Sequence, residues 1–523
     1  MAPTLAGPRD HGLFGCVLAL AAALRVLVML GYDTARLYWY DSFTYLDTAV
    51  RLRPQGAFHP AGYSWFLWAL RPFQSVELVA GVQHAMGLAV GVMIYLLLRR
   101  RSLPAWGAAL ASAPVLFDPA FVRLEHAVLS DTQVIFLVVA ALLVLMWRGE
   151  VSTRAAAVAG VLLALAGLTR TATVPLLGLA ALYLLLRRTA WQARWQARWQ
   201  ARWQARWQAR WQARWQARWQ ARWQARWQAR WQARWQARWQ ARWRATLALV
   251  VAGALPLAAY AGWYAQHHGR FALSGSDGVA LWARTMTFAD CSIIRPPADQ
   301  AALCPNGTVL DAASEYVWDP RASLNRLPGD RFTHNDLARA FALRAIAAQP
   351  LDYLREVVRD TSLAFTWEPV AHPKRMSPTT AFQRGSWPLP SGQPFVDQVR
   401  KEYDPDIRGM RSVEPFASIL AAYPYPWFLH GTLFGVLLLA GGAGAVLRPR
   451  AALLPWSFAV FLLVAPVAAL DFDHRYVLPA IPVACVAAAL AVRRPAPRRS
   501  GGYPRGYDHV ARPRASANGS RAS

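Results

Sequence analysis

The chain has 523 residues, of which 55% are hydrophobic and only 16% are charged, and its mean hydropathy is positive at +0.16. This composition is too apolar for an ordinary soluble enzyme and indicates a protein of the lipid bilayer. Thirteen of the 28 net positive charges lie in one tetrapeptide repeat, and the other 15 are spread over the loops. The charge therefore indicates membrane topology rather than a basic face for nucleic acid.

About ten apolar runs approach the roughly 20 residues that cross a bilayer. The predicted spans are approximately 13–31, 76–98, 103–117, 128–147, 155–169, 172–186, 245–264, 427–446, 451–470 and 476–492. Arginines follow alternate spans, and positive loops stay in the cytoplasm. We therefore expect a multi-pass protein of the plasma membrane with both termini cytoplasmic.

Six parts follow from these spans and their flanking charges. They are an N-terminal transmembrane catalytic module with two outer loops (1–190), a cytoplasmic repeat (191–244), one transmembrane helix (245–264), an extracytoplasmic domain (265–425), C-terminal transmembrane helices (426–494) and a basic cytoplasmic tail (495–523). The tail is rich in Arg, Pro, Gly and Ser, so we expect it to be disordered. The predicted fold class is an all-α polytopic membrane protein.

Thirteen copies of the tetrapeptide Trp-Gln-Ala-Arg fill residues 191–242. Four residues turn a helix by about 400°, so the tryptophans shift by about 40° with each copy and form no fixed apolar stripe. Ala, Gln and Arg still allow a helical rod that touches anionic headgroups. We interpret the array as an expansion in a tolerant cytoplasmic loop. We expect no nucleic-acid partner, because no recognised nucleic-acid module accompanies the array.

Four cysteines fit the same topology. Cys16 and Cys485 lie in separate spans and are expected to be small buried apolar residues. Cys291 and Cys304 lie together in the outer domain, where an oxidising compartment favours a disulfide. Two unpaired thiols are the alternative.

The first outer loop places an acid among aromatic residues about ten residues beyond the first span. This acid is Asp41 in the stretch YWYDSFTYLDTA. A carboxylate desolvated near the membrane surface has a raised pKa, so Asp41 is a candidate base or metal ligand. His59, in the same loop, is a candidate substrate-binding residue. A solvated interfacial aspartate beside an aromatic belt is the alternative.

Three ionisable residues lie at the mouth of the fourth span. Glu125 and His126 precede the span, and Asp131 lies in its first turns. The helix dipole favours acids at this end, which explains one of them structurally. Glu, His and Asp within seven residues of a membrane helix indicate a cavity-lining site. Glu125 is therefore a candidate catalytic residue, and His126 and Asp131 are candidate substrate-binding residues.

Two arginines are expected at the same level of the membrane. Arg170 lies in the outer turn of GLTRTATVP, and Arg475 precedes Tyr476 at the start of the last span. A guanidinium at the membrane boundary suits a phosphate group. The alternative is that each arginine pairs with a nearby acid and reaches toward the interface.

The order and sidedness of these motifs resemble the type C (GT-C) membrane glycosyltransferases, the class of protein O-mannosyltransferases and lipid A aminoarabinose transferases. The matching stretches are YWYDSFTYLDTA, FHPAGYSWFL, EHAVLSD, GLTRTATVP and RYVLPAIP. The stretch GSDGVALWARTMTFADCS also resembles an actinobacterial branch of that class. The resemblance covers about residues 10–190 and, more thinly, the final spans. It implies a GT-C-like helical bundle with juxtamembrane helices in the first outer loop and a mixed extracytoplasmic domain.

The resemblance also implies a reaction and roles for several residues. A sugar would pass from a polyprenyl-phosphate donor to an extracytoplasmic acceptor, with Asp41 as base or metal-linked carboxylate and Glu125 as the second-loop acid. Arg170 and Arg475 would neutralise the lipid phosphate, with Tyr476 beside them. A divalent ion, Mg²⁺ or Mn²⁺, could accompany the reaction.

Two other classes of protein remain open from the sequence. A transporter or flippase of lipid-linked sugars would also place charges among its helices, although we find no inverted repeat. A membrane-anchored binding protein would use the outer domain and keep the spans as a scaffold.

Overall fold

The computed structural model describes residues 11–38, 40–54, 59–186, 219–375, 381–423 and 427–492, with side chains in the long helix α11 described from residue 239 onward. The predicted tail (495–523) and the repeat up to residue 218 lie outside these residues. Almost all regular structure in the described part is helical, as predicted.

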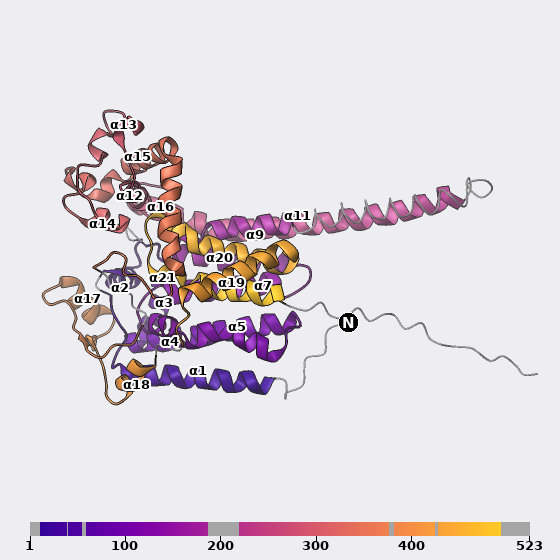
Figure 1. Ribbon diagram of the computed structural model, residues 1–523, viewed down its shortest axis with the longest axis horizontal. Helices are drawn as coiled ribbons and strands as arrows, with labels where there is room; N and C mark the ends of the chain where they lie inside the picture. Colours follow the sequence, from indigo (N-terminus) through magenta and orange to yellow (C-terminus); the bar gives the residue numbers. More distant parts are fainter. Residues whose placement is uncertain are drawn as a thin grey trace, which may run out of the picture.

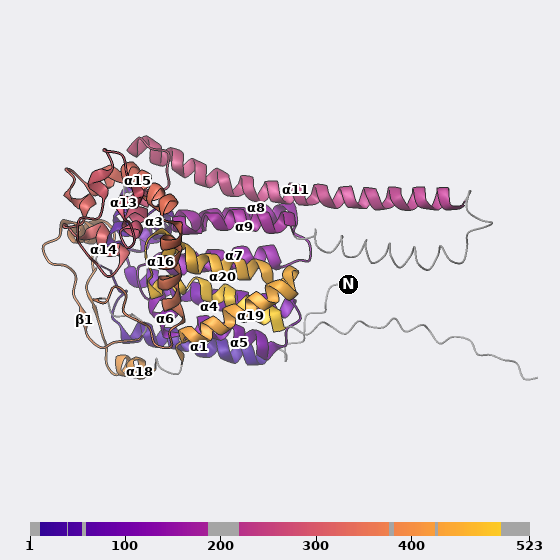
Figure 2. The same ribbon diagram turned by 45° about the horizontal axis from the view of Figure 1, so that its top comes forward.

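A bundle of apolar helices forms the larger part of the protein. Its helices are α1 (Gly12–Gly31), α4 (Val76–Arg100), α5 (Ala105–Phe117), α6 (Pro119–Glu125), α7 (Asp131–Met146), α8 (Thr153–Thr169), α9 (Pro175–Leu186), α11 (Trp219–His268), α19 (Gly431–Leu447), α20 (Pro449–Ala469) and α22 (Ala480–Val492). Figures 1 and 2 show the long members packed side by side along a common direction. Apart from the repeat portion of α11, these helices consist mostly of apolar residues, as expected for helices that contact both protein and lipid.

Each of the ten predicted spans coincides with a helix of the bundle. Within the described residues, five helices are long and apolar enough to cross a membrane, and α5 and α6, bent by 55°, would make a sixth span. The helices α7, α8, α9 and α19 are apolar but shorter than 18 residues. The protein is thus a mostly helical membrane protein, whereas ten crossings stay a prediction.

The later copies of the repeat and the seventh predicted span form one continuous helix. This helix, α11, has no break at the predicted boundary near residue 244. Figure 1 shows that it projects beyond the bundle, away from the end that carries the outer domain. Its apolar part packs closely against α8, because a Cβ on Gly160 would lie 2.3 Å from the carbonyl oxygen of Leu249.

The end of the bundle opposite the repeat carries the remaining helices. The first outer loop contributes α2 (Asp41–Arg51), α3 (Gly62–Leu70) and η2 (Arg71–Phe73), which are the predicted juxtamembrane helices. The outer domain contributes α12 (Asp277–Thr285), α13 (Cys291–Ile294), η4 (Ala301–Leu303), α14 (Ala313–Trp318), η5 (Ser323–Arg326), η6 (Arg331–His334), α15 (Asn335–Ala348), α16 (Pro350–Ser362), η7 (Leu363–Phe365), α17 (Pro394–Glu402) and α18 (Phe416–Ala422). The remaining elements at this end are the turn η3 (Thr171–Thr173) and the short helix α21 (His474–Val477).

Strands form only a small part of the outer domain. Ser386–Trp387 (β1) pairs antiparallel with Met410–Arg411 (β2), with Ser386 opposite Arg411. The described residues of this domain combine many short helices with this one small sheet. The domain has its own core around Trp282, Leu324 and Phe341, all fully buried, so the burial of these large side chains holds the short helices together.

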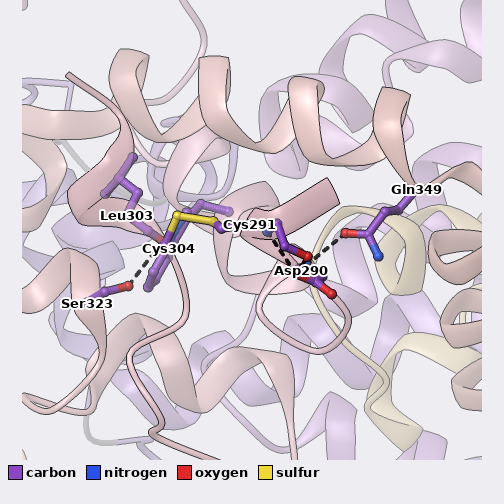
Figure 3. Close-up of a disulfide and its surroundings, with 8 residues drawn as sticks. Asp290, Cys291, Leu303, Cys304, Ser323 and Gln349 are labelled. Atoms are coloured by element: carbon purple, nitrogen blue, oxygen red, sulfur yellow. Dashed lines mark hydrogen bonds between the residues drawn. A yellow bond between two sulfur atoms is a disulfide. The ribbon is translucent and has the colours of Figure 1, made fainter. Parts of the chain in front are cut away.

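The predicted disulfide between Cys291 and Cys304 is present (Figure 3). It closes the loop between α13 and η4 with a Cα to Cα distance of 6.0 Å. Asp290 fixes the same corner, because its side chain caps α13 and its backbone N–H donates to Gln349 at 2.8 Å. Of the other two cysteines, Cys485 is buried as predicted, whereas Cys16 is exposed on α1, which corrects the expectation for that residue.

The helix α16 crosses the outer ends of two bundle helices. The Tyr353 hydroxyl donates to the Ala468 carbonyl near the end of α20 at 3.0 Å, and Thr432 at the start of α19 donates to the Phe365 carbonyl at 3.1 Å. Figures 1 and 2 show α16 running across the direction of the bundle. Three apolar side chains point away from the protein, those of Leu351, Leu354 and Val358. This spacing makes one apolar stripe on the helix, which suits a position in the membrane interface.

We expect a fluorophore on α16 to report a lipid environment. In a background with Cys16 and Cys485 replaced by Ala, an environment-sensitive dye on Leu354→Cys should emit blue-shifted light and be quenched by nitroxide-labelled lipids in proteoliposomes. The same dye on Val309→Cys, an exposed outer-domain position, should emit as in water. Equal, water-like emission from both positions would contradict the interfacial placement of α16.

Candidate active site

Six of the eight residues predicted for the site meet at the outer end of the bundle. They come from four separate segments of the chain. The six are Asp41, His59, Asp131, Arg170, Arg475 and Tyr476. We call this set the outer ion cluster.

The two acids of the outer ion cluster each begin a helix. Asp41 is the first residue of α2, and Asp131 is the first residue of α7. The positive end of each helix dipole favours a carboxylate there. Arg170 follows the last residue of α8, where the dipole favours a cation. Arg475 lies in α21, which Asp473 caps by accepting the Arg475 backbone N–H at 2.8 Å.

Asp41 uses its two oxygens for two different partners. Oδ1 lies 3.3 Å from His59 Nε2, and Oδ2 accepts a hydrogen bond from Arg475 Nη1 at 3.2 Å. The side chain keeps 25% of its surface exposed. Asp41 is therefore anchored in orientation but still reachable by a ligand.

Asp131 lies deeper and holds both arginines. Its Oδ1 lies 2.9 Å from Arg170 Nη1, and its Oδ2 lies 3.9 Å from Arg475 Nε. The side chain of Asp131 is 0% exposed, so it cannot contact a substrate in this conformation. We therefore assign Asp131 a positioning role, because its charge keeps two guanidinium groups at the site.

A tyrosine ring separates the two arginines of the outer ion cluster. The guanidinium carbons of Arg170 and Arg475 lie 5.0 Å and 5.5 Å from the centre of the Tyr476 ring. Cations over an aromatic face are stabilised by the ring quadrupole. Arg170 also approaches Ser130, with Nε 3.4 Å from the hydroxyl oxygen. Tyr476 thus contacts and stabilises both cations.

The pKa of Asp41 differs from the sequence-based expectation. Burial alone would raise this pKa, but the hydrogen bond with His59 and the positive charges of Arg475 and Arg170 outweigh burial and hold the pKa well below its usual range. The expectation of a raised pKa is wrong, because the sequence could not show that cations from residues 170 and 475 reach Asp41. The carboxylate is ionised at neutral pH.

Glu125 and His126 lie outside the outer ion cluster, in a second buried group. Glu125 pairs with Arg25 (Oε1 to Nη2, 2.8 Å) and with His84 (Oε2 to Nδ1, 2.9 Å). The Glu125 side chain is only 3% exposed. A Cβ on Gly87 would lie 1.8 Å from Glu125 Oε1, so the glycine makes room for the carboxylate. The structure therefore does not bring Glu125 to the predicted catalytic position.

Hydrogen bonds link the second group to the outer loop. His84 Nε2 lies 3.3 Å from His126 Nδ1, and His126 Nε2 lies 3.0 Å from the Thr34 carbonyl oxygen. A carbonyl only accepts, so His126 Nε2 carries the proton of the bond to Thr34. The backbone at His126 accepts the Arg36 N–H at 2.9 Å. This group consequently holds the first outer loop against the start of α7.

Two arginines that the sequence analysis missed lie beside the outer ion cluster. Arg36 stacks between Tyr38 and Trp387, with its guanidinium carbon 5.2 Å and 5.0 Å from the two ring centres. Arg123 is largely buried, and its Nη1 has no hydrogen-bond partner among the described residues. Neither arginine forms an ion pair with a carboxylate in the described parts of the chain. One of the two arginines precedes an apolar stretch and the other lies within one. A charged residue at such a position is the sequence signal that could have identified both.

A cavity joins these arginines to the outer ion cluster. It encloses about 810 Å³, open mouth included, and Arg36, Arg123 and Arg475 line one part of it. Apolar side chains from α19 and the last helical segment line another part, including Phe434 and Ile481. The cavity therefore combines three cations with an apolar wall, which suits an amphipathic anion.

One acid, Asp118, also lines this cavity, but each of its oxygens already accepts a backbone hydrogen bond. Asp118 accepts the backbone N–H groups of Ala120 at 2.8 Å and of Leu429 at 2.9 Å. These bonds cap α6 and tie it to the segment before α19. Asp118 is therefore an anchor of the cavity wall.

Asp41 does not fit the predicted alternative role of a metal ligand. Both of its oxygens already have partners, one of them a cation, which repels a metal ion. Among the described residues, Asp41 belongs to no group of three His, Cys, Asp or Glu side chains close enough to share an ion. We therefore derive no step through a metal at this site.

Removal of the His59 imidazole should raise the pKa of Asp41. In His59→Phe the ring contact with Tyr45 (4.7 Å between centroids) can be kept, while the hydrogen bond to Asp41 is lost. Because its pKa is depressed, Asp41 in the wild type stays charged until the pH falls well below the usual range for an aspartate. Without the His59 partner, Asp41 should become protonated at a higher pH than in the wild type. We expect the acid limb of the kcat/KM profile to move to higher pH in His59→Phe. The control is His267→Phe, which changes an exposed histidine of α11 and should leave the acid limb unchanged. An unchanged acid limb in His59→Phe would contradict this assignment.

The chain has only distant similarity to known proteins. No family model matches the chain, and no curated protein matches its sequence. Among solved structures, the chain is similar to ArnT from Cupriavidus metallidurans bound to undecaprenyl phosphate, with a TM-score of 0.33 and 13% identity over 92% of this chain and 78% of that chain. The apo state of that ArnT gives a TM-score of 0.32 and 12% identity over 91% and 76%.

Proposed function

We propose that the protein is an integral membrane glycosyltransferase that moves a sugar from a polyprenyl-phosphate donor to a hydroxyl group of an extracytoplasmic acceptor. The observation that carries this proposal is the cavity in which three arginines meet an apolar wall, with one of them, Arg475, bonded to Asp41. The sequence resemblance described above supports the same donor class. A donor of this class has a phosphate, an apolar chain and a sugar, and each needs a different surface.

The donor phosphate binds between Arg36, Arg123 and Arg475 in this proposal. The charges of Arg170 and Arg475 are already matched by Asp41 and Asp131 in the outer ion cluster. Arg36 and Arg123 add two positive charges without a carboxylate partner in the described chain. Arginine forks bind phosphate with strong charge-assisted hydrogen bonds. Arg170 then fixes Asp131 and has no direct contact with the phosphate.

The first isoprene units lie along the apolar wall of the cavity. Phe434 of α19 and Leu478 and Ile481 near the start of α22 line that wall. Burial of apolar surface stabilises by about 25 cal/mol per Å², so an isoprenoid chain gains affinity without directional contacts. The sugar then extends from the phosphate toward Asp41.

The reaction is a displacement at the anomeric carbon. The acceptor oxygen forms a bond to that carbon, and the bond from carbon to the phosphate oxygen breaks with its electron pair on the phosphate. Asp41 takes the acceptor proton, and the arginines stabilise the charge that develops on the leaving phosphate. Attack from the face opposite the phosphate inverts the anomeric configuration.

Donor binding also makes Asp41 a better base. Arg475 lines the cavity and bonds Asp41 at the same time. When a phosphate competes for Arg475, Asp41 loses part of the positive charge that holds its pKa down. Proton uptake by Asp41 is therefore favoured only when a donor is in place.

Replacement of Asp41 tests this function. Purified wild-type protein and Asp41→Asn would be given radiolabelled polyprenyl-phosphate sugars together with an extract of envelope glycans, and release of the lipid phosphate followed. We expect Asp41→Asn to lower kcat by about 10²- to 10⁴-fold, as for loss of a general base. The matched control is Asp47→Asn, in the same helix, where the carboxylate pairs with Arg51.

Two outcomes would contradict the enzyme. Full turnover by Asp41→Asn would remove Asp41 from the chemistry. Movement of intact donor across proteoliposomes by wild type, with no release of lipid phosphate, would instead favour a transporter of lipid-linked sugars.

A further inference from the structure

Three metal-ligating side chains meet where the outer domain contacts the start of the last helices. They are Asp360 at the end of α16, His372 in the following loop and Asp471 after α20. One ligand atom of each lies within 4.8 Å of those of the other two. We propose that these three residues bind a divalent cation, Zn²⁺ or Mn²⁺, that fastens the outer domain to the segment carrying Arg475.

The donor set suits a borderline metal ion. Two carboxylates and one imidazole match Zn²⁺, and Mn²⁺ accepts the same ligands. Zinc binds such nitrogen and oxygen atoms at roughly 2.0–2.2 Å, so ligand atoms on one ion are about 3–4 Å apart. Separations of up to 4.8 Å would therefore need to shorten by about 1–2 Å. His372 Nε2 already lies 2.7 Å from Asp471 Oδ1. Three protein ligands leave further positions for water.

Neighbouring donors hold the two carboxylates in orientation. Asp471 Oδ2 accepts hydrogen bonds from the Ser314 backbone N–H at 3.0 Å and the Ser314 hydroxyl at 2.7 Å. Buried Arg284 donates to Asp360 Oδ2, and among the described residues the other oxygen of Asp360 accepts no hydrogen bond. Asp471 Oδ1, the oxygen that faces His372, also accepts the Phe472 backbone N–H at 2.7 Å, so it would keep that bond and bind the ion with its other lone pair.

The local charge favours a cation. Two more carboxylates belong to this region besides those of Asp360 and Asp471. Glu315 follows Ser314 directly, and its charge is opposed by Arg375, whose Nε lies 2.5 Å from Glu315 Oε1. Asp311 lies near His372 and accepts the Lys374 backbone N–H at 2.6 Å. Carboxylates therefore outnumber the guanidinium groups of Arg284 and Arg375 in this region, and a divalent ion would compensate the excess negative charge.

The position of this group gives the ion a positioning role. The segment that begins with Asp471 continues to Arg475 of the outer ion cluster. His474 Nε2 lies 2.9 Å from the Val370 carbonyl oxygen, so the two segments that supply His372 and Asp471 already run together. An ion between them would limit the movement of Arg475. Asp41 is not among the three ligands, so the ion acts on the site through the position of Arg475.

Metal binding by the full-length purified protein tests this site independently of glycosyl transfer. After EDTA treatment and dialysis, the protein would be titrated with Zn²⁺ and with Mn²⁺ by calorimetry, and bound metal counted by mass spectrometry. We expect one ion per chain in wild type and at least a 10-fold weaker affinity in His372→Gln and Asp471→Asn. The control His334→Gln alters a half-buried histidine of the same domain that lies outside the proposed site and should bind as wild type.

A spectroscopic measurement on the wild type covers the case in which the variants fail to fold. Co²⁺ bound at this site should absorb weakly in the visible range and show no thiolate charge-transfer band, because the ligands are nitrogen and oxygen. The absence of a stoichiometric ion in wild type, or wild-type affinity in a folded His372→Gln, would overturn the proposal. A thiolate band would overturn it as well, since it would assign the ion to a cysteine.

Discussion

The placement of Arg475 between Asp41 and Asp131 is the interaction on which the outer end of the protein depends. It joins the first outer loop, the start of α7 and the last helical segment, which are far apart in the sequence. Charges removed from water are tolerated only when they are paired, and breaking such a pair typically costs about 3–5 kcal/mol. The same pairing therefore closes the fold at this end and sets the electrostatics of the site.

In the proposed reaction, this arrangement links donor recognition to base strength. Arg475 is shared between the cavity and Asp41, so a phosphate in the cavity competes with the carboxylate for one guanidinium group. Asp131 is fully enclosed and keeps both arginines in place whatever binds. In the proposed reaction the cluster thus has a fixed part, Asp131 with Arg170, and an adjustable part, Asp41 with Arg475.

Sequence patterns predicted the helical segments and six residues of the outer ion cluster, because apolar run length and the sidedness of charge are local properties. The pKa direction of Asp41 depends on contacts between distant segments, so it could not be predicted. Glu125 was placed at the site because it precedes the α7 span, but Arg25 and His84 draw it into the bundle. Arg36 and Arg123 gave no motif, and only the folded cavity brings them beside Arg475.

The position of a bound lipid phosphate tests the account most directly. A cryo-EM structure of the protein in nanodiscs with polyprenyl phosphate should place the phosphate within hydrogen-bond distance of Arg36, Arg123 and Arg475. The isoprenoid chain should then run along Phe434 and Ile481. A phosphate bound away from all three arginines, or at the end of the bundle from which α11 projects, would contradict the account.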